Sequence, residues 1–238
     1  MEERGLPGTL RVYGCAAEET EGAKVYMARE GLFSDLAAAL HWHPMAYAGV
    51  FNLRLAAMNQ LAVEFFGRTA HAGMEPWKGR SALHAAELFA HGINLMREHL
   101  EPTARVHYAF QRAGESPNVV PDYARVWLFV RDADRGRVEE TTRWVERIAE
   151  GAALATRTAS KVELRFGMYD LLPNGPLAER MQVHLERVGV PEWTEEEQRF
   201  ARECQENFGV EARGMAAEVL PLSDEVTLGA SSDVGDVS

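Results

Sequence analysis

The chain has 238 residues, of which 46% are hydrophobic and 26% are charged, an ordinary composition for a folded globular protein. It carries 25 Lys and Arg residues against 36 Asp and Glu residues, so the formal net charge is −11. This balance argues against nucleic acids and anionic membranes as partners, because both are negatively charged. The sequence shows neither a bilayer-spanning apolar run nor the core of a signal peptide, and its two cysteines are too few for a disulfide framework; we therefore expect a cytoplasmic protein.

The first 55 residues predict parts of an α/β domain. We expect a short strand over residues 8–14, a helix over residues 21–30, and a buried strand over residues 35–43 that carries histidines at its C-terminal end. These elements are too few to form a complete sheet.

The central part of the chain, residues 56–172, has a regular pattern of apolar residues. Alternation with a period of two predicts strands, and recurrence every three or four residues predicts helices. The predicted order is strand, helix, strand, strand, helix, strand, which is the split arrangement of a ferredoxin-like domain. The strands are expected around residues 61–65, 106–110, 126–130 and 162–166, and the helices over residues 85–100 and 138–152.

The last part of the chain, residues 173–238, predicts two further helices. The first covers residues 177–188. The second begins at Thr194, where Glu197 completes a capping box, and is expected to end at Gly209. The tail is rich in small and polar residues, and we expect no terminating element there. Together with residues 1–55, this part predicts an incomplete domain into which residues 56–172 are inserted.

Two acidic residues, Glu18 and Glu19, follow the first predicted strand. Adjacent side chains point in different directions, so one carboxylate is able to bind a metal ion while the other faces the attacking water as a general base. The alternative is two solvated glutamates that a helix dipole favours near a helix start. His41 and His43 lie on one face of the strand predicted over residues 35–43, where imidazoles are suitable zinc ligands. The alternative there is one packing histidine and one surface histidine.

Three residues of the central part are further candidates. His71 lies in a loop of small residues, from which it is able to donate a hydrogen bond to an oxyanion. Asn118 lies between two prolines that restrict the backbone, and Arg131 ends a predicted strand as a natural partner for a substrate carboxylate. The alternatives are a turn histidine, a turn asparagine and a surface arginine.

The order of these motifs resembles the zinc aminoacylase and glutamate carboxypeptidase family of metallopeptidases. The resemblance covers nearly the whole chain and implies a fold: a partial three-layer α/β metallopeptidase catalytic domain with an inserted ferredoxin-like α+β dimerisation lid. The motifs that carry it are Ala17-Glu18-Glu19, His43, Phe66-Gly67, Ala70-His71-Ala72, Gly79-Arg80-Ser81-Ala82-Leu83, Asn118 to Asp122, and Val130-Arg131.

The resemblance also implies a role for each matching residue. Glu18 is expected to be the general base, and His71 is expected to reach a partner subunit and stabilise the oxyanion. Asn118 and Arg131 are expected to contact the substrate carboxylate. The implied metal ligands are Glu19 and His43, with His43 preferred over His41 because it directly precedes Pro44.

The implied activity is metal-dependent hydrolysis of an acyl-amino acid amide, with aminobenzoyl-glutamate cleaved to aminobenzoate and glutamate. The implied cofactor is Zn²⁺ or Mn²⁺, with two ions in the complete enzyme. The implied partner is a second copy of the chain or a related subunit. The alternatives are a dipeptidase or deacylase of the same family, or a truncated homologue that acts only in dimerisation.

The chain departs from the family pattern at both ends. The family has metal ligands upstream of the glutamate pair, but the seventeen residues before Glu18 hold no histidine. A further histidine ligand is expected beyond Ser238. Catalytic zinc normally takes three protein ligands, so we expect an internal fragment that neither binds zinc tightly nor hydrolyses amides.

Overall fold

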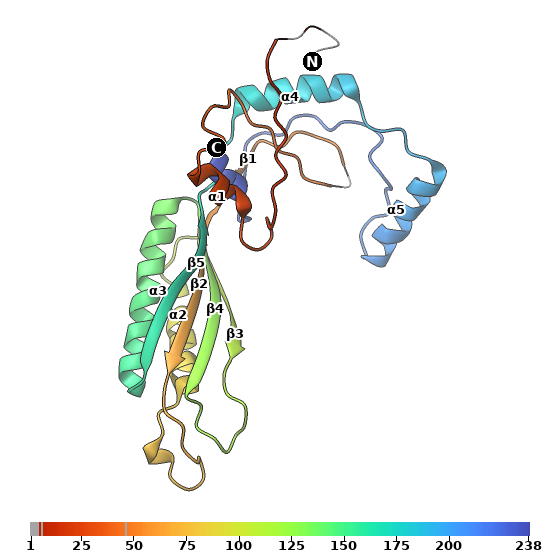
Figure 1. Ribbon diagram of the computed structural model, residues 1–238. Coiled ribbons are helices and arrows are strands. Elements are labelled where there is room, and N and C mark those ends of the chain that lie inside the picture. Colours follow the sequence, from red (N-terminus) through yellow and green to blue (C-terminus); the bar gives the residue numbers. More distant parts are fainter. Residues whose placement is uncertain (1–4, 6, 46) are drawn as a thin grey trace.

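The computed structural model describes residues 5, 7–45 and 47–238 (Figure 1). A long central domain of sheet and helices, called the lid below, extends from β2 to β5 (residues 57–168). The described residues before β2 and after β5 lie together at one end of the lid and form the flanking part (Figure 1). Among the described residues, no helix is long and apolar enough to cross a membrane.

The lid contains a four-stranded antiparallel sheet in the order β3-β4-β2-β5. Two helices, α2 and α3, pack together against one face of it. This order confirms the ferredoxin-like arrangement. The strands are β2 (Ala57–Phe66), β3 (Arg105–Arg112), β4 (Tyr123–Asp132) and β5 (Ala159–Met168), and the helices are α2 (Ala82–Arg97) and α3 (Arg135–Thr156).

Side-chain hydrogen bonds cap the first turns of the two lid helices. The Ser81 hydroxyl accepts a hydrogen bond from the backbone N–H of His84 at 3.2 Å, and the Asp134 carboxylate accepts one from the backbone N–H of Arg137 at 3.0 Å. Both contacts satisfy amides that have no partner within their helix. Arg157 ends α3 in a left-handed conformation with φ of 54°.

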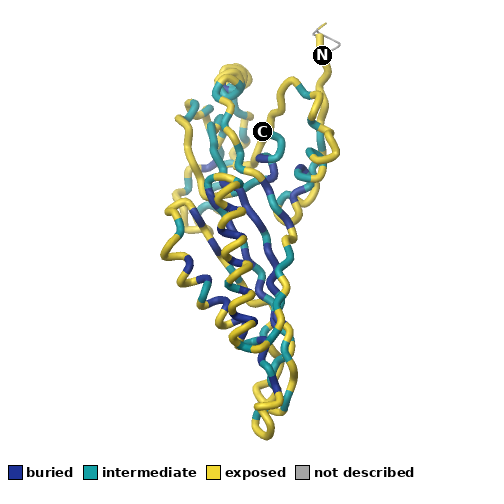
Figure 2. The backbone as a smooth tube through the Cα atoms, turned by 90° about the vertical axis from the view of Figure 1, so that its left-hand side faces the viewer, coloured by how far each residue is buried: buried dark blue, intermediate teal, exposed yellow. Residues whose placement is uncertain are grey.

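The core of the lid lies between the sheet and the two helices (Figure 2). Residues of β4 alternate between buried and half-buried along its whole length, as the period of a strand with one covered face requires. Each fully buried large apolar side chain contributes about 1.5–3 kcal/mol. The largest of them are Leu61, Phe65, Phe89, Ile93, Met96 and Leu128.

The flanking part holds the remaining elements. β1 (Leu53–Leu55) and β6 (Val226–Leu228) form a parallel pair, and α5 begins with the capping box that Thr194 and Glu197 predict. The helices are α1 (Ala23–Arg29), α4 (Gly175–Val188) and α5 (Glu195–Asn207), and the short 3-10 helices of the chain are η2 (Pro76–Lys78), which belongs to the lid, and η3 (Asp233–Val237).

Three predictions for the flanking part are wrong. Residues 8–14 and 35–43 form no strand, and Val12, for example, is 89% exposed. A strand needs a neighbour for its backbone N–H and C=O groups, and the described residues provide none for these two segments. The tail does form a terminating element, η3, in which Asp233 and Gly235 are buried. The domain limits at residues 55/56 and 172/173 stay a prediction.

Candidate functional site

The glutamate pair lies in a tight turn that leads into α1. Ala17 adopts a left-handed conformation with φ of 54°. Its carbonyl oxygen accepts hydrogen bonds from the backbone N–H groups of Glu21 at 3.0 Å and Gly22 at 2.8 Å. This turn leaves Glu18 half-buried and Glu19 exposed. The Ser232 hydroxyl donates to Oε1 of Glu18 at 2.7 Å, across 214 positions of sequence.

A buried ion pair holds the Ser232 segment against α1. The carboxylate of Asp233 is 0% exposed, and it accepts from Nζ of Lys24 at 2.7 Å and from the backbone N–H of Lys24 at 3.0 Å. Gly22 allows this close packing, because a Cβ there would lie 3.1 Å from Cβ of Asp233 and 2.3 Å from the ring of Phe166. The segment that holds the glutamate turn is therefore joined to the C-terminal segment around Asp233.

The two histidines of the flanking part differ in their surroundings. Both side chains are exposed, and Nδ1 of His43 lies 3.0 Å from the carbonyl oxygen of Pro44. Partial loss of water around the ring lowers the pKa of His41, and the positive charge of Lys24 lowers it further, whereas the carboxylate of Glu18 raises it. The assignment of His43 as a metal ligand stays a prediction.

The described residues hold no complete metal centre around Glu19 and His43. Within the described part of the chain, no group of three or more His, Cys, Asp or Glu side chains is placed to hold a metal ion. The residues present therefore do not fit a complete catalytic metal centre, which normally needs three protein ligands.

A second group of candidates lies at the far tip of the lid. His71 pairs with Val119 in an antiparallel bridge, and the backbone N–H of Ala72 donates to the carbonyl oxygen of Asn118 at 2.9 Å. The backbone N–H of Gly73 lies 3.2 Å from Nδ1 of His71 and donates to it. In the neutral ring the proton is then assigned to Nε2, which is free to act as a hydrogen-bond donor.

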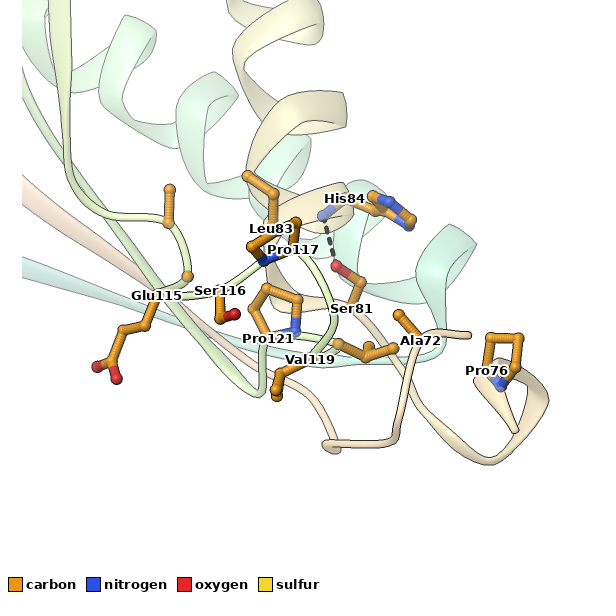
Figure 3. Close-up of a pocket in the computed structure, with 13 residues that line it drawn as sticks. Ala72, Pro76, Ser81, Leu83, His84, Glu115, Ser116, Pro117, Val119 and Pro121 are labelled. Carbon is orange, nitrogen blue, oxygen red and sulfur yellow. Dashed lines mark hydrogen bonds between the residues drawn. The ribbon is translucent and has the colours of Figure 1, made fainter. Parts of the chain in front are cut away.

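The tip also contains a hollow of about 490 Å³ beside the His71 loop (Figure 3). The loop after β3 and the first turn of α2 provide its walls, and the hydrogen bond from His84 to Ser81 is visible at its edge. Close backbone packing shapes this region, because a Cβ on Gly67 would lie 2.0 Å from the carbonyl oxygen of Arg80. The start of the His71 loop therefore packs against the segment that leads into α2.

Arg131 lies at the opposite end of the lid from Asn118. It is half-buried, and burial lowers the pKa of its guanidinium group. Its Nη1 lies 3.5 Å from the carbonyl oxygen of Gly229, three residues before Ser232. Asn118 precedes β4 and Arg131 lies near its end, so about 30 Å of extended strand separates them. The structure thus brings His71 and Asn118 together, and it places Arg131 beside the flanking part.

The sequence pattern did not identify Lys24, Ser232 or Asp233 as parts of the site. A lysine near a helix start and a serine in a polar tail are each common on protein surfaces. The burial of Asp233 depends on contacts between residues 209 positions apart, which no local pattern reports.

The curated proteins to which the chain is similar include a hydrolase and a dipeptidase. It is 40% identical to one subunit of the p-aminobenzoyl-glutamate hydrolase of Escherichia coli K12, over 100% of this chain and 55% of the relative. It is 28% identical to the Xaa-Arg dipeptidase of Mus musculus, over 77% of this chain and 43% of the relative. The chain therefore spans about half the length of these curated relatives.

Structural and family comparisons agree with the fold. The crystal structure of the aminobenzoyl-glutamate utilization protein from Klebsiella pneumoniae matches with a TM-score of 0.64 and 21% identity, over 94% of this chain and 51% of that chain. The family profile described as a peptidase dimerisation domain matches residues 57–157, from β2 to the end of α3. Residues 57–157 are therefore similar to the M20 peptidase dimerisation domain.

Proposed function

We propose that this protein belongs to an enzyme that hydrolyses the amide bond between an acyl group and an amino acid, with aminobenzoyl-glutamate as the substrate. The observation that carries the proposal is the fixed carboxylate of Glu18, half-buried in a turn and hydrogen-bonded by Ser232 at 2.7 Å. The 40% identity to a hydrolase of p-aminobenzoyl-glutamate over the full chain supports the choice of substrate.

Each of the proposed site residues has a separate role in the reaction. Glu18 takes a proton from the attacking water and later passes it to the leaving amine, so that the proton removed in the first step is returned in the second. Nε2 of His71 donates a hydrogen bond to the oxyanion that forms at the carbonyl carbon. The guanidinium of Arg131 and the amide of Asn118 bind the carboxylate of the amino-acid half.

The metal requirement sets a limit on what this chain does alone. Glu19 and His43 are two proposed ligands for Zn²⁺ or Mn²⁺, with two ions in the complete enzyme. Two ligands are fewer than a catalytic zinc normally takes, so we expect the 238-residue chain alone to bind zinc weakly and to be inactive. In the complete enzyme, the remaining ligands would come from segments that correspond to the parts of the relatives outside the matched region.

The separation of the lid residues determines how an active site would be assembled. His71 and Asn118 lie at the tip of the lid, and Arg131 lies near the flanking part, so one protomer does not bring all three to one substrate. The site is therefore shared across a dimer: one protomer provides Glu18 and Arg131, and its partner provides His71 and Asn118. The partner is a second copy or a related subunit.

Mixing variants tests this arrangement. The protein encoded by the complete open reading frame would be assayed for release of aminobenzoate from aminobenzoyl-glutamate. The 238-residue chain would be assayed in parallel. Glu18→Ala and His71→Ala are each expected to be inactive, whereas subunit exchange between them restores up to about a quarter of the activity, because one of the two sites in each mixed dimer is intact. Glu18→Ala mixed with Arg131→Ala is the matched control and is expected to stay inactive.

Two results would contradict the proposal. Strong turnover by the 238-residue chain with added zinc would contradict the incomplete metal site. Activity of the Glu18→Ala and Arg131→Ala mixture equal to that of the Glu18→Ala and His71→Ala mixture would contradict the shared site.

Two other functions remain candidates. The similarity to an Xaa-Arg dipeptidase favours a dipeptidase or deacylase, which a panel of dipeptides and acyl-amino acids distinguishes from aminobenzoyl-glutamate hydrolysis. The match to a dimerisation domain favours a non-catalytic dimerisation partner. In that case the complete protein would form dimers and hydrolyse none of these substrates.

A further inference from the structure

The side chain of Glu18 receives a hydrogen bond from Ser232, near the other end of the sequence. Oε1 of Glu18 accepts the hydroxyl proton of Ser232 at 2.7 Å, and the carboxylate is half-buried rather than buried. A half-buried glutamate on a turn has several accessible rotamers. The hydrogen bond to Oε1 favours one of these rotamers. Oε2 accepts no hydrogen bond from Ser232 and is able to exchange a proton.

The direction of the Ser232 hydroxyl follows from its second contact. Oγ of Ser232 also lies 3.5 Å from the backbone N–H of Val234, at the start of η3, and accepts from it. A hydroxyl group has one proton to donate, and Glu18 is the acceptor at hydrogen-bond distance. The serine therefore acts toward Glu18 as a donor.

The backbone of Ser232 is itself fixed by the buried ion pair. The next residue, Asp233, is 0% exposed and is bound by both the side chain and the backbone N–H of Lys24. Lys24 lies in the first turn of α1, six residues after Glu18. The ion pair thus holds the donor and the acceptor on two segments that are locked together.

We infer that Ser232 is a positioning residue for the general base, and that the Lys24–Asp233 ion pair sets its position. This inference rests on the proposed function, because it concerns Glu18 as the base. Ser232 acts through Glu18 and does not touch the substrate. Its hydroxyl holds Oε1, so that the proton leaves and returns through Oε2.

Ser231 provides a matched control. Its hydroxyl oxygen is buried and has no hydrogen-bond partner among the described residues. Ser231→Ala and Ser232→Ala therefore remove the same hydroxyl oxygen from neighbouring positions. Only the hydroxyl of Ser232 is hydrogen-bonded to Glu18. Ser232→Thr keeps the hydroxyl and serves as the conservative variant.

The first readout needs no activity. In the 238-residue chain, hydrogen exchange of the amides of Glu21 and Gly22, which close the Glu18 turn, is measured by mass spectrometry. Ser232→Ala is expected to accelerate this exchange about tenfold, as the loss of one hydrogen bond to a charged group predicts. Ser231→Ala and Ser232→Thr are expected to match the wild type. Equal exchange in Ser231→Ala and Ser232→Ala would overturn the inference.

The second readout uses kinetics of the complete protein. Ser232→Ala is expected to lower kcat about tenfold and to change KM less than about twofold, since the substrate contacts stay intact. Ser232→Thr is expected to recover kcat to within about threefold of the wild type, an effect that loss of packing alone would not produce. A rise in KM with unchanged kcat would overturn the role. An inactive wild type would instead refute the proposed function, while the exchange measurement still decides whether Ser232 holds Glu18.

Discussion

Replacement of Lys24 by methionine tests how strongly the two ends of the chain are joined. In Lys24→Met the Asp233 carboxylate loses its Nζ partner at 2.7 Å and keeps the backbone N–H at 3.0 Å. The Lys24 side chain is 10% exposed and that of Asp233 is 0% exposed, so water does not replace the lost contact. Removal of one partner of such a pair costs about 3 kcal/mol, because it leaves an uncompensated buried charge.

The expected loss is local. About 3 kcal/mol corresponds to a more than hundredfold increase in the opening of the contact between α1 and η3. Hydrogen exchange of peptides that cover residues 20–30 and 230–238 measures this opening, and the lid is expected to keep its protection. The lid has its own core, so its exchange provides an internal reference.

Arg29→Met is the control for this experiment. Arg29, the last residue of α1, forms an ion pair with the next residue, Glu30, at 3.3 Å, but the two side chains are 68% and 66% exposed. Exposed pairs contribute about 0–1 kcal/mol, so exchange in Arg29→Met should remain close to that of the wild type. Similar exchange in the two variants would refute the argument that burial makes the Lys24–Asp233 pair important.

Three further predictions concern other parts of the molecule. Asn59→Leu breaks one buried and one part-buried hydrogen bond to α3, at 2.9 Å and 2.6 Å, and should lower the free energy of unfolding of the lid by about 2 kcal/mol in a urea titration; an unchanged midpoint would contradict this. Gly67→Ala forces a Cβ to within 2.0 Å of the Arg80 carbonyl oxygen, so activity of the complete protein should fall strongly while dimers persist in gel filtration. Burial raises the pKa of Asp236, so the folded state binds its proton more tightly and stability decreases as pH rises from about 4 through the folded pKa. Asp236→Asn should therefore equal the wild type below pH 4 and exceed it in stability at neutral pH, whereas parallel pH profiles would contradict this cause.

The lid could be predicted from the sequence because its elements are stabilised within one contiguous segment. The alternation along β4 and the helical recurrence along α3 each report a face that packs against neighbouring elements of the same domain. The capping box at Thr194 was predictable for a similar reason, since its partner is three residues away. Local spacing contains the information that these elements need.

The flanking part could not be predicted in the same way. Residues 35–43 have the apolar pattern of a buried strand, yet Leu40 is 66% exposed. An apolar run indicates that a segment is suited to burial, and the outcome depends on whether neighbouring strands are present. The candidate residues at Glu18 and His71 were found through the order of their motifs, but their surroundings depend on contacts such as that between Glu18 and Ser232, 214 positions apart.

The positions of the candidate residues lead to one constraint on the reaction. Asn118 precedes the ten-residue strand β4 and Arg131 lies near its far end, so any substrate that contacts both must bridge two protomers or be about 30 Å long. An acyl-amino acid is far shorter than that. Hydrolysis with both proposed carboxylate contacts therefore requires a dimer, and activity should decrease in proportion to the dimer population when the protein is diluted below its dissociation constant. Full activity per chain in a monomeric state would show that Asn118 and Arg131 do not bind the same substrate.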